Sequence, residues 1–360
     1  MTDTTATTPA PPADLDLCGM YPAEIAEALN LKPFQGKQIF RWIHQKKIFE
    51  FDKMTDLSKA LRDSFSATHR VTRLKLVRTA TSANTETRKA LLELADGETV
   101  EAVMIPSRDR VTLCLSTQVG CAVKCSFCAT GLSGYARNLT PGEIVEQALF
   151  LLREVDLGGR SPNIVFMGMG EPFRNYDATT KAIRILMHPD GLGIGARRIT
   201  VSTAGEADGI RQFAGEDWQV RLSVSLHAAN DPLRDELVPL NRRYNLAKLM
   251  EAIDFYLERA GRQITFEWTL LADVNDTLKH AEELTQLIGG RPIHVNLIPY
   301  NPVGGTPYEA PGRKRAESFR DALTARGIGA TLRLERGQDI SAACGQLRRQ
   351  TLEPALAEKH

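Results

Sequence analysis

The chain has 360 residues, of which 42% are hydrophobic, which is enough for one large folded domain with a smaller accessory domain. Its formal net charge of +1 neither favours nor excludes a nucleic-acid partner when taken over the whole chain. No apolar run approaches the ~18 residues needed to span a bilayer, and residues 1–16 lack the basic and apolar parts of a secretory signal. We therefore expect a globular cytoplasmic protein without membrane association.

The N-terminal part combines a polar tail with a basic segment. Residues 1–16 are rich in Thr, Pro and Ala, which predicts a disordered tail. Apolar residues at helical spacing from Pro22 to Ser66 then predict a small helical accessory domain, assigned to residues 17–89. From Lys32 to Lys89 the chain carries 14 Lys/Arg and 5 Asp/Glu. This segment is either an RNA-binding face or an ordinary solvated helical surface.

The remainder of the chain alternates between strand and helix patterns. Residues 90–109 are predicted to form a β connector around a turn at Asp96 and Gly97. Beyond Arg110, short β-branched runs alternate with amphipathic stretches, which is typical of βα units around parallel strands. Six strands are predicted, at Val111–Ser116, Asn163–Met167, Arg198–Ser202, Val220–Leu226, Gln263–Leu271 and Ile293–Ile298. We expect an α/β fold with a partial (β/α)6 barrel over residues 110–347, and a tail over 348–360.

Three cysteines lie close together after the first predicted barrel strand. Cys121, Cys125 and Cys128 have the spacing C-x3-C-x2-C, and the 6 cysteines of the chain are not spread like a disulfide framework. Three thiolates on one loop can hold three corners of a [4Fe–4S] cluster and leave one iron open to substrate. Structural zinc is the alternative, but a closed zinc site needs a fourth ligand, and only Cys114, inside a strand, lies nearby.

The cysteine motif resembles that of the radical S-adenosylmethionine (SAM) superfamily, whose open iron chelates the amino and carboxylate groups of SAM. The resemblance implies reductive cleavage of SAM to a 5′-deoxyadenosyl radical. Candidate SAM-binding residues follow the later strands in order; they are Gly170, Glu171, Ser202, Ser225, Leu226 and His227. Glycines let a ligand approach the backbone, and the Glu171 carboxylate can accept hydrogen bonds from an ammonium or a ribose. Taken singly, each is more often an ordinary turn or strand-end residue.

Further segments narrow the resemblance to the adenine-C2 RNA methyltransferases of the RlmN type. These segments are Lys32–Trp42, Thr112–Cys121, Arg137–Thr140, Phe166–Pro172, Ile298–Pro302 and Asp339–Leu347. The resemblance implies methylation of carbon 2 of an adenine in the peptidyl-transferase centre of 23S rRNA and of the adenine adjoining the anticodon in some tRNAs. It also implies an external low-potential electron donor, and we expect a monomer.

The same resemblance supplies roles for residues that composition leaves unexplained. Cys344 matches the methyl-carrying cysteine and Cys114 its transient disulfide partner; of two SAM molecules per turnover, one methylates Cys344 and the other yields the radical. Glu101 matches the proton acceptor of the family, and Asn301 matches a SAM-contacting asparagine. Without the resemblance, the sequence favours a small buried strand residue for Cys114 and an ordinary thiol in a loop of small residues for Cys344. Glu101 could equally be an exposed strand position, and the alternative for Asn301 is an ordinary turn residue before proline.

Three other functions stay open at this point. The homologous adenine-C8 methyltransferases of 23S rRNA, which confer antibiotic resistance, share these motifs, although Val119 and the segment Gly134–Asn138 match the C2 enzymes better. The second is a radical SAM enzyme that acts on a protein or a small molecule. The basic N-terminal domain and the pair Cys114 and Cys344 argue against this function. A non-enzymatic cluster or zinc protein is the third, and it would leave the candidate SAM-binding residues unexplained.

Overall fold

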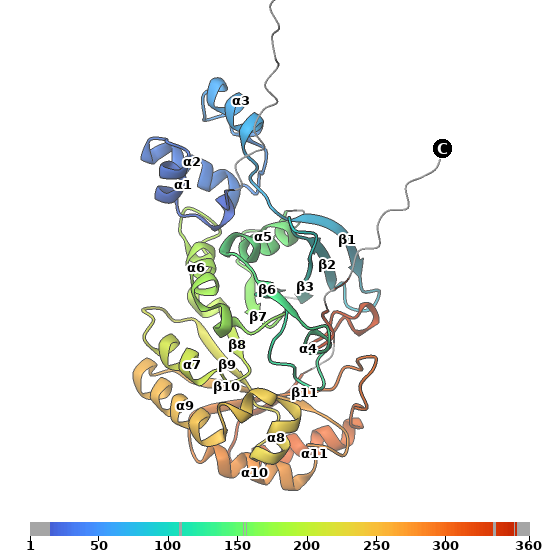
Figure 1. Ribbon diagram of the computed structural model, residues 1–360. Helices are drawn as coiled ribbons and strands as arrows, with labels where there is room; N and C mark the ends of the chain where they lie inside the picture. Colours follow the sequence, from blue (N-terminus) through green and yellow to red (C-terminus); the bar gives the residue numbers. More distant parts are fainter. Residues whose placement is uncertain are drawn as a thin grey trace, which may run out of the picture.

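The computed structural model describes residues 15–107, 110–153, 155, 157–333, 336–348 and 350. The expected tails, residues 1–16 and 348–360, lie almost entirely outside the described residues. Only Leu15, Asp16, Arg348 and Gln350 of these tails are described. A helical N-terminal unit lies at the top of Figure 1, above an α/β body built around one large sheet. Within the described part of the chain, no helix is long and apolar enough to cross a membrane.

The N-terminal unit is formed by short amphipathic helices, as predicted. They are α1 (Pro22–Ala28), α2 (Pro33–His44) and α3 (Lys59–Thr68), preceded by the 3-10 helix η1 (Leu17–Gly19). Proline at the first turn of α1 and of α2 favours the start of each helix. The α2 side chains of Lys37 and Arg41 form ion pairs with Asp190 of the body, at 3.0 and 2.6 Å. These two basic residues therefore contact the body across the junction with the N-terminal unit.

The connector contains one strand more than predicted. Its strands are β1 (Lys75–Thr81), β2 (Arg88–Glu93) and β3 (Thr99–Ser107), which pair antiparallel in that order. The boundary of the helical domain at residue 89 is therefore wrong, because β1 and the start of β2 precede it. The reason is that nearly every residue of β1 is exposed, so the strand lacks the alternation of apolar residues that marks a half-buried strand. The predicted turn at Asp96 and Gly97 is confirmed.

All six predicted barrel strands are confirmed in order. They are β4 (Arg110–Cys114), β7 (Asn163–Phe166), β8 (Ile199–Thr203), β9 (Arg221–Ser225), β10 (Ile264–Leu270) and β11 (Ile293–Pro299). A short parallel strand, β12 (Ala330–Leu332), follows β11 in the sheet; its partly exposed residues gave no signal in the sequence. The described strands have the order β1-β2-β3-β4-β7-β8-β9-β10-β11-β12. Because β4 and β12 are not neighbours in it, the barrel is open between them, as a partial barrel requires.

Helices cover the outside of the parallel strands (Figure 1). They are α5 (Pro141–Leu152), α6 (Tyr176–Met187), α7 (Ala207–Ala214), α8 (Asp231–Leu237), α9 (Leu246–Ala260), α10 (Leu278–Ile288) and α11 (Arg313–Thr324). The short strands β5 (Gln118–Gly120) and β6 (Tyr135–Asn138) form a separate pair on either side of the cysteine loop and α4 (Ala129–Leu132). This arrangement places the cysteine loop at the C-terminal ends of the barrel strands, where catalytic residues of such folds gather.

Candidate active site

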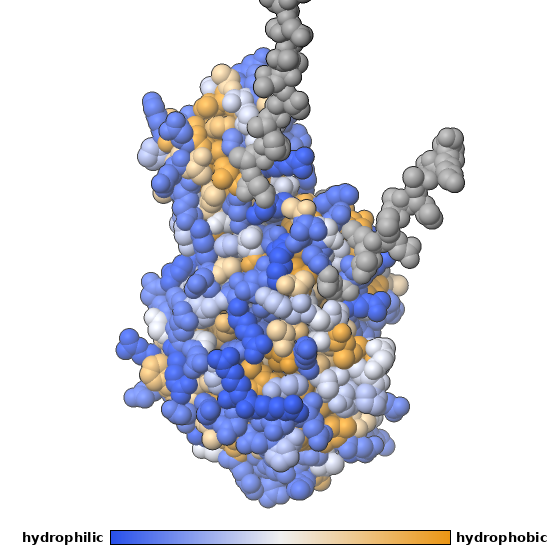
Figure 2. All heavy atoms as spheres, viewed as in Figure 1, coloured by the Kyte–Doolittle hydropathy of each residue, from blue (hydrophilic) through white to orange (hydrophobic). Residues whose placement is uncertain are grey.

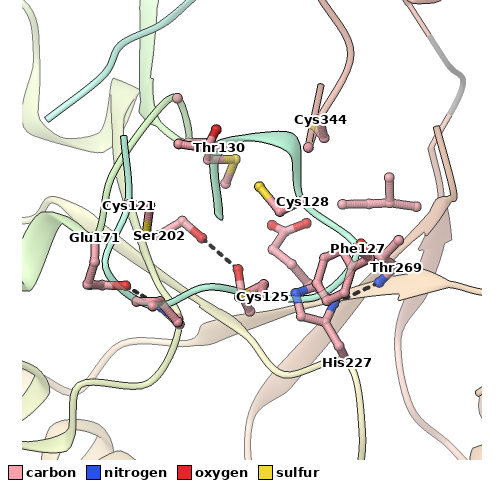
Figure 3. A pocket seen from close by; sticks show the side chains of 18 of the residues that line it. Cys121, Cys125, Phe127, Cys128, Thr130, Glu171, Ser202, His227, Thr269 and Cys344 are labelled. Carbon is pink, nitrogen blue, oxygen red and sulfur yellow. Dashed lines mark hydrogen bonds between the residues drawn. The ribbon is translucent and has the colours of Figure 1, made fainter. Parts of the chain in front are cut away.

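The three clustered cysteines line one pocket, as Figure 3 shows. Their loop runs from β5 to α4, and Cys128 is the N-cap residue of α4. Backbone hydrogen bonds fix the loop at both ends: the N–H of Cys121 donates to the carbonyl of Gly134 at 2.9 Å, and that of Cys128 donates to the carbonyl of Cys125 at 3.2 Å. The thiols therefore point into the pocket from a rigid loop rather than from a free segment.

The chemistry of these thiols fits an iron–sulfur cluster. Burial raises the pKa of Cys121 to about 12 and the pKa of Cys125 well above its ordinary value, so these thiols need a bound metal to ionise. Among the described residues, no three His, Cys, Asp or Glu side chains lie close enough together to bind one metal ion. A cubane cluster binds each thiolate through a different iron, so three cysteines that line one pocket without surrounding a single point suit it.

The surface of the pocket is mostly apolar and carries several polar side chains. The pocket encloses about 910 Å³, including the open space at its mouth. It brings together most of the predicted site residues with the cysteines; they are Gly170, Glu171, Ser202, Ser225, His227 and Cys344. Gly170 has a φ of +105°, and a Cβ atom there would lie 2.6 Å from the Cβ of Gln118, so the turn requires glycine.

The Glu171 carboxylate holds two turns of the site together. One oxygen accepts a hydrogen bond from the N–H of Phe173 at 3.1 Å, and the other accepts from the N–H of Ala204 at 2.7 Å. Burial raises the pKa of Glu171 to about 7, while both backbone donors favour the ionised form. Glu171 lines the pocket, and each of its oxygens accepts one backbone hydrogen bond and keeps a second lone pair for a ligand donor.

Residues at the C-terminal ends of β8 and β9 also line the pocket. The hydroxyl oxygens of Ser202 and Ser225 lie 3.4 Å apart, and both residues line the pocket. The Nδ1 of His227 accepts a hydrogen bond from the N–H of Thr269 at 2.9 Å, and burial lowers the pKa of His227 to about 3. His227 is therefore neutral near pH 7 and carries its proton on Nε2. The side chain of Leu226 is buried in the core and does not line the pocket. Of this residue, only backbone atoms could make the predicted contact with SAM.

Sequence reasoning missed Arg234, whose fully buried guanidinium organises these turns. Arg234 lies on α8 and donates hydrogen bonds to the carbonyl of Leu226 at 3.1 Å, to the carbonyl of Ala204 at 2.7 Å and to the side chain of Asn241 at 2.9 Å. Burial lowers the pKa of Arg234 to about 10, so the group stays charged near pH 7. From the sequence, an arginine on a short amphipathic helix is expected to be exposed to solvent. The residues around Arg234 in the sequence do not indicate that it is buried.

Replacing Arg234 by methionine should lower the free energy of unfolding by about 3–5 kcal/mol, because its buried carbonyl and amide partners lose their donors. Urea unfolding followed by circular dichroism measures the change. Arg242→Met is the matched control, since Arg242 is exposed and lies close by in the sequence. Equal unfolding midpoints for the two variants would contradict the organising role of Arg234.

The thiol of Cys344 lies at the border of two cavities. It lines the pocket of the clustered cysteines and also a second cavity of about 1310 Å³, including its mouth, which lies toward the open side of the barrel. Cys114, at the end of β4, lines the second cavity, and burial raises the pKa of Cys114 to about 12. The structure thus brings together two cysteines that are 230 positions apart in the sequence.

The Cys344 loop is held by Asn301 and by α4. The side-chain amide of Asn301 donates to the carbonyl of Cys344 at 3.2 Å, and its oxygen accepts from Gln338 at 2.7 Å. The N–H of Ala129, which follows the cluster cysteines, donates to the carbonyl of Gly345 at 2.8 Å. Asn301 lines the second cavity rather than the first, so its observed contacts position the Cys344 loop.

Glu101 is placed away from both cavities. It is fully buried in β3, not exposed, and its carboxylate pairs with Lys89 at 2.9 Å. It also accepts hydrogen bonds from the N–H of Arg348 at 3.0 Å and the side chain of Gln350 at 2.8 Å. Arg333, which sequence reasoning missed, lies nearer the cysteines, with Nη1 4.0 Å from the Cys344 sulfur.

Comparison with known proteins gives two family matches. Residues 115–287 match the radical SAM superfamily, and residues 15–71 match the ribosomal RNA large subunit methyltransferase N-terminal domain. A protein of Heliobacterium modesticaldum described as "Probable dual-specificity RNA methyltransferase RlmN" is 48% identical over 344 residues, covering 92% of this chain and 89% of its own. A protein of Geobacillus kaustophilus with the same description is 46% identical over 318 residues, covering 88% and 87%.

A solved structure is similar over almost the same length. The crystal structure of a radical SAM methyltransferase from Sphaerobacter thermophilus is 47% identical in sequence and superposes with a TM-score of 0.89. The similarity covers 92% of this chain and 98% of that one, so it includes both the N-terminal unit and the partial barrel.

Proposed function

Because this chain belongs to the RlmN family of dual-specificity RNA methyltransferases in the radical SAM superfamily, we propose that it methylates carbon 2 of an adenine in 23S rRNA and in tRNA. The observation that carries this proposal is the position of Cys344 between the pocket of the cluster cysteines and the cavity that holds Cys114. A methyl carrier must reach its donor on one side and its acceptor on the other.

The reaction needs a carrier because carbon 2 of adenine is an electrophilic ring carbon without an acidic proton. Bound at Cys121, Cys125 and Cys128, a [4Fe–4S] cluster with SAM would supply a methyl group and a radical, from two SAM molecules per turnover and an external low-potential electron donor. The Cys344 thiolate takes up the methyl group, and loss of one hydrogen atom from this methyl group to the radical would let its carbon bond to carbon 2 of the adenine. The adduct would then return one electron to the cluster and lose the ring proton. The Cys114 thiolate attacks the Cys344 sulfur, so that the disulfide forms as the sulfur–carbon bond to RNA breaks and the released carbon takes up a proton. Both thiols line the cavity in which this exchange would take place.

The second cavity suits a base that has left its stack. Apolar side chains, including Ile105, Met167 and Leu332, form its walls, and the cationic groups Arg110 and Arg336 line it as well. Enzymes that act on a ring carbon extrude the base into such a pocket, while basic groups contact the neighbouring phosphates. On the face shown in Figure 2, hydrophobic residues gather near the centre of the body and hydrophilic residues surround them.

We propose that Glu101 is the proton acceptor of the reaction. Its buried carboxylate is covered by Arg348 and Gln350, so this role requires those two residues to move when RNA binds. Asn301 is likewise proposed to contact SAM, although in the structure its amide holds the Cys344 loop. We propose further that the enzyme acts as a monomer in the cytoplasm, where ribosomes and tRNAs are found.

Mass analysis of nucleosides tests the proposed reaction. RNA incubated anaerobically with the reconstituted enzyme, SAM and a reductant should yield 2-methyladenosine. Formation of 8-methyladenosine instead would assign the chain to the C8 reaction, and unmodified RNA would reject the proposal. Parallel incubations with 23S rRNA fragments and with tRNA show whether both classes are substrates.

The basic N-terminal unit is proposed to bind RNA phosphates. Changing the exposed Lys32, Lys46 and Lys59 to Gln should weaken RNA binding and lower the slope of log affinity against log salt by about 2–3, because fewer counterions are released. Filter binding at several salt concentrations measures both quantities. The matched control changes the same number of exposed lysines on the opposite end of the body, Lys248, Lys279 and Lys314. If both triple variants gave equal slopes, the unit would be only a solvated surface.

A further inference from the structure

One oxygen of a buried carboxylate in the pocket of the cluster cysteines has no hydrogen-bond donor among the described residues. Glu267 lies on β10, lines this pocket and is only 3% exposed. Its Oε1 accepts a hydrogen bond from the side chain of Asn296 at 3.1 Å, whereas its Oε2 has no hydrogen-bond partner among the described residues. A buried polar atom without a partner is costly, so native structures rarely leave one unless water or a ligand completes it.

The surroundings of Glu267 combine burial with nearby polar groups and a positive charge, and the net effect is a pKa above the ordinary value. Burial raises the pKa of Glu267, whereas the positive charge of Arg333 and the side chains of Asn296 and Ser223 lower it. In the parallel sheet, Glu267 lies in register with Ser225 on one side and with Asn296 on the other. Ser225 also lines the pocket, so the two side chains form adjacent parts of one polar wall.

The chemical groups of SAM limit which hydrogen-bond donors could reach the free Oε2 of Glu267. SAM offers an ammonium group, two ribose hydroxyls and an adenine amine, and in this superfamily the amino group is bound at the open iron near the cysteines. The ribose lies between that end of SAM and the adenine. A carboxylate with one free oxygen is a common acceptor for a ribose hydroxyl in nucleotide sites. Glu267 faces the pocket from β10, whereas Cys121 and Glu171 lie on the loops after β5 and β7.

The geometry points to Glu267 as the residue whose free Oε2 accepts a hydrogen bond from a ribose hydroxyl of SAM. This assignment deepens the proposed function and rests on it, because it takes SAM as the ligand. It makes Glu267 a cofactor-binding residue on β10 beside Ser225, and it explains why a carboxylate is placed in the barrel interior without a full set of protein donors.

Equilibrium binding of SAM to the anaerobically reconstituted holoenzyme, without reductant, tests the assignment apart from turnover. Glu267→Gln should weaken SAM binding by about 10-fold, and Glu267→Met by more, as expected for the loss of a hydrogen bond to a charged group. Iron and sulfide content and circular dichroism verify that each variant keeps its cluster and fold. Glu146→Gln is the matched control, because Glu146 is another buried carboxylate but lines neither cavity.

Analogues of SAM that lack the 2′- or the 3′-hydroxyl locate the contact. The wild-type enzyme should lose about 10-fold in affinity for one of these analogues, and Glu267→Met should bind that analogue and SAM with nearly equal affinity. If the cluster-loaded Glu267 variants bound SAM like the wild type, or lost the same factor for SAM and for both analogues, the ribose assignment would be overturned. A wild-type holoenzyme that did not bind SAM would overturn the proposed function itself.

Discussion

The Cys114→Ala variant should accumulate RNA that is covalently attached to Cys344. The variant keeps the methyl carrier at the border of the two cavities but lacks the thiol that would release the product by forming a disulfide. Turnover should fall to background while the adduct approaches one RNA per active enzyme. Denaturing gels with labelled RNA should show a shifted band that nuclease digestion trims.

The Cys344→Ala variant should show neither methylation nor adduct, since the bond to RNA requires this sulfur. The double variant with both Cys114 and Cys344 changed to alanine should also form no adduct. This result would show that Cys344 acts before Cys114 in the reaction. Cys18→Ala is the control, because Cys18 is another buried free cysteine but lies in η1, outside both cavities. Normal turnover by Cys114→Ala, or methylation by Cys344→Ala, would require abandoning the methyl-cysteine mechanism in favour of direct radical methylation.

Replacing any one of Cys121, Cys125 or Cys128 by alanine should abolish SAM cleavage. Each thiolate is expected to hold a different iron, so two remaining ligands would retain the cluster poorly. Formation of 5′-deoxyadenosine and the iron and sulfide content should fall together to background in all three variants. The Cys344→Ala protein serves as the comparison, because it should keep a full cluster and still cleave SAM.

A variant with one cluster cysteine removed that formed 5′-deoxyadenosine at the wild-type rate would contradict the cluster assignment. A protein that bound one zinc ion per chain and no sulfide after anaerobic reconstitution would instead support the structural-zinc alternative. These two readouts separate loss of the cluster from loss of catalysis, since metal and sulfide content are measured without substrate.

The sequence by itself determined the features that depend on neighbouring residues. The spacing of Cys121, Cys125 and Cys128 is a property of one loop, and it predicted the cluster site directly. The order of the six barrel strands followed from β-branched runs between amphipathic stretches, because each such strand is buried on both faces within its own segment. The strand β1 escaped prediction because its residues are exposed, and only pairing with β2 makes it a strand.

Only the tertiary structure decided which polar side chains are free to act. The Glu101 carboxylate is buried against Lys89 and the N–H of Arg348. One oxygen of Glu171 accepts a hydrogen bond from the N–H of Ala204, which follows another strand. Arg234 and Glu267 became visible only through burial. The physical reason is that the charge, burial and hydrogen bonding of a side chain depend on partners brought together by the fold, and local sequence patterns carry no record of those partners.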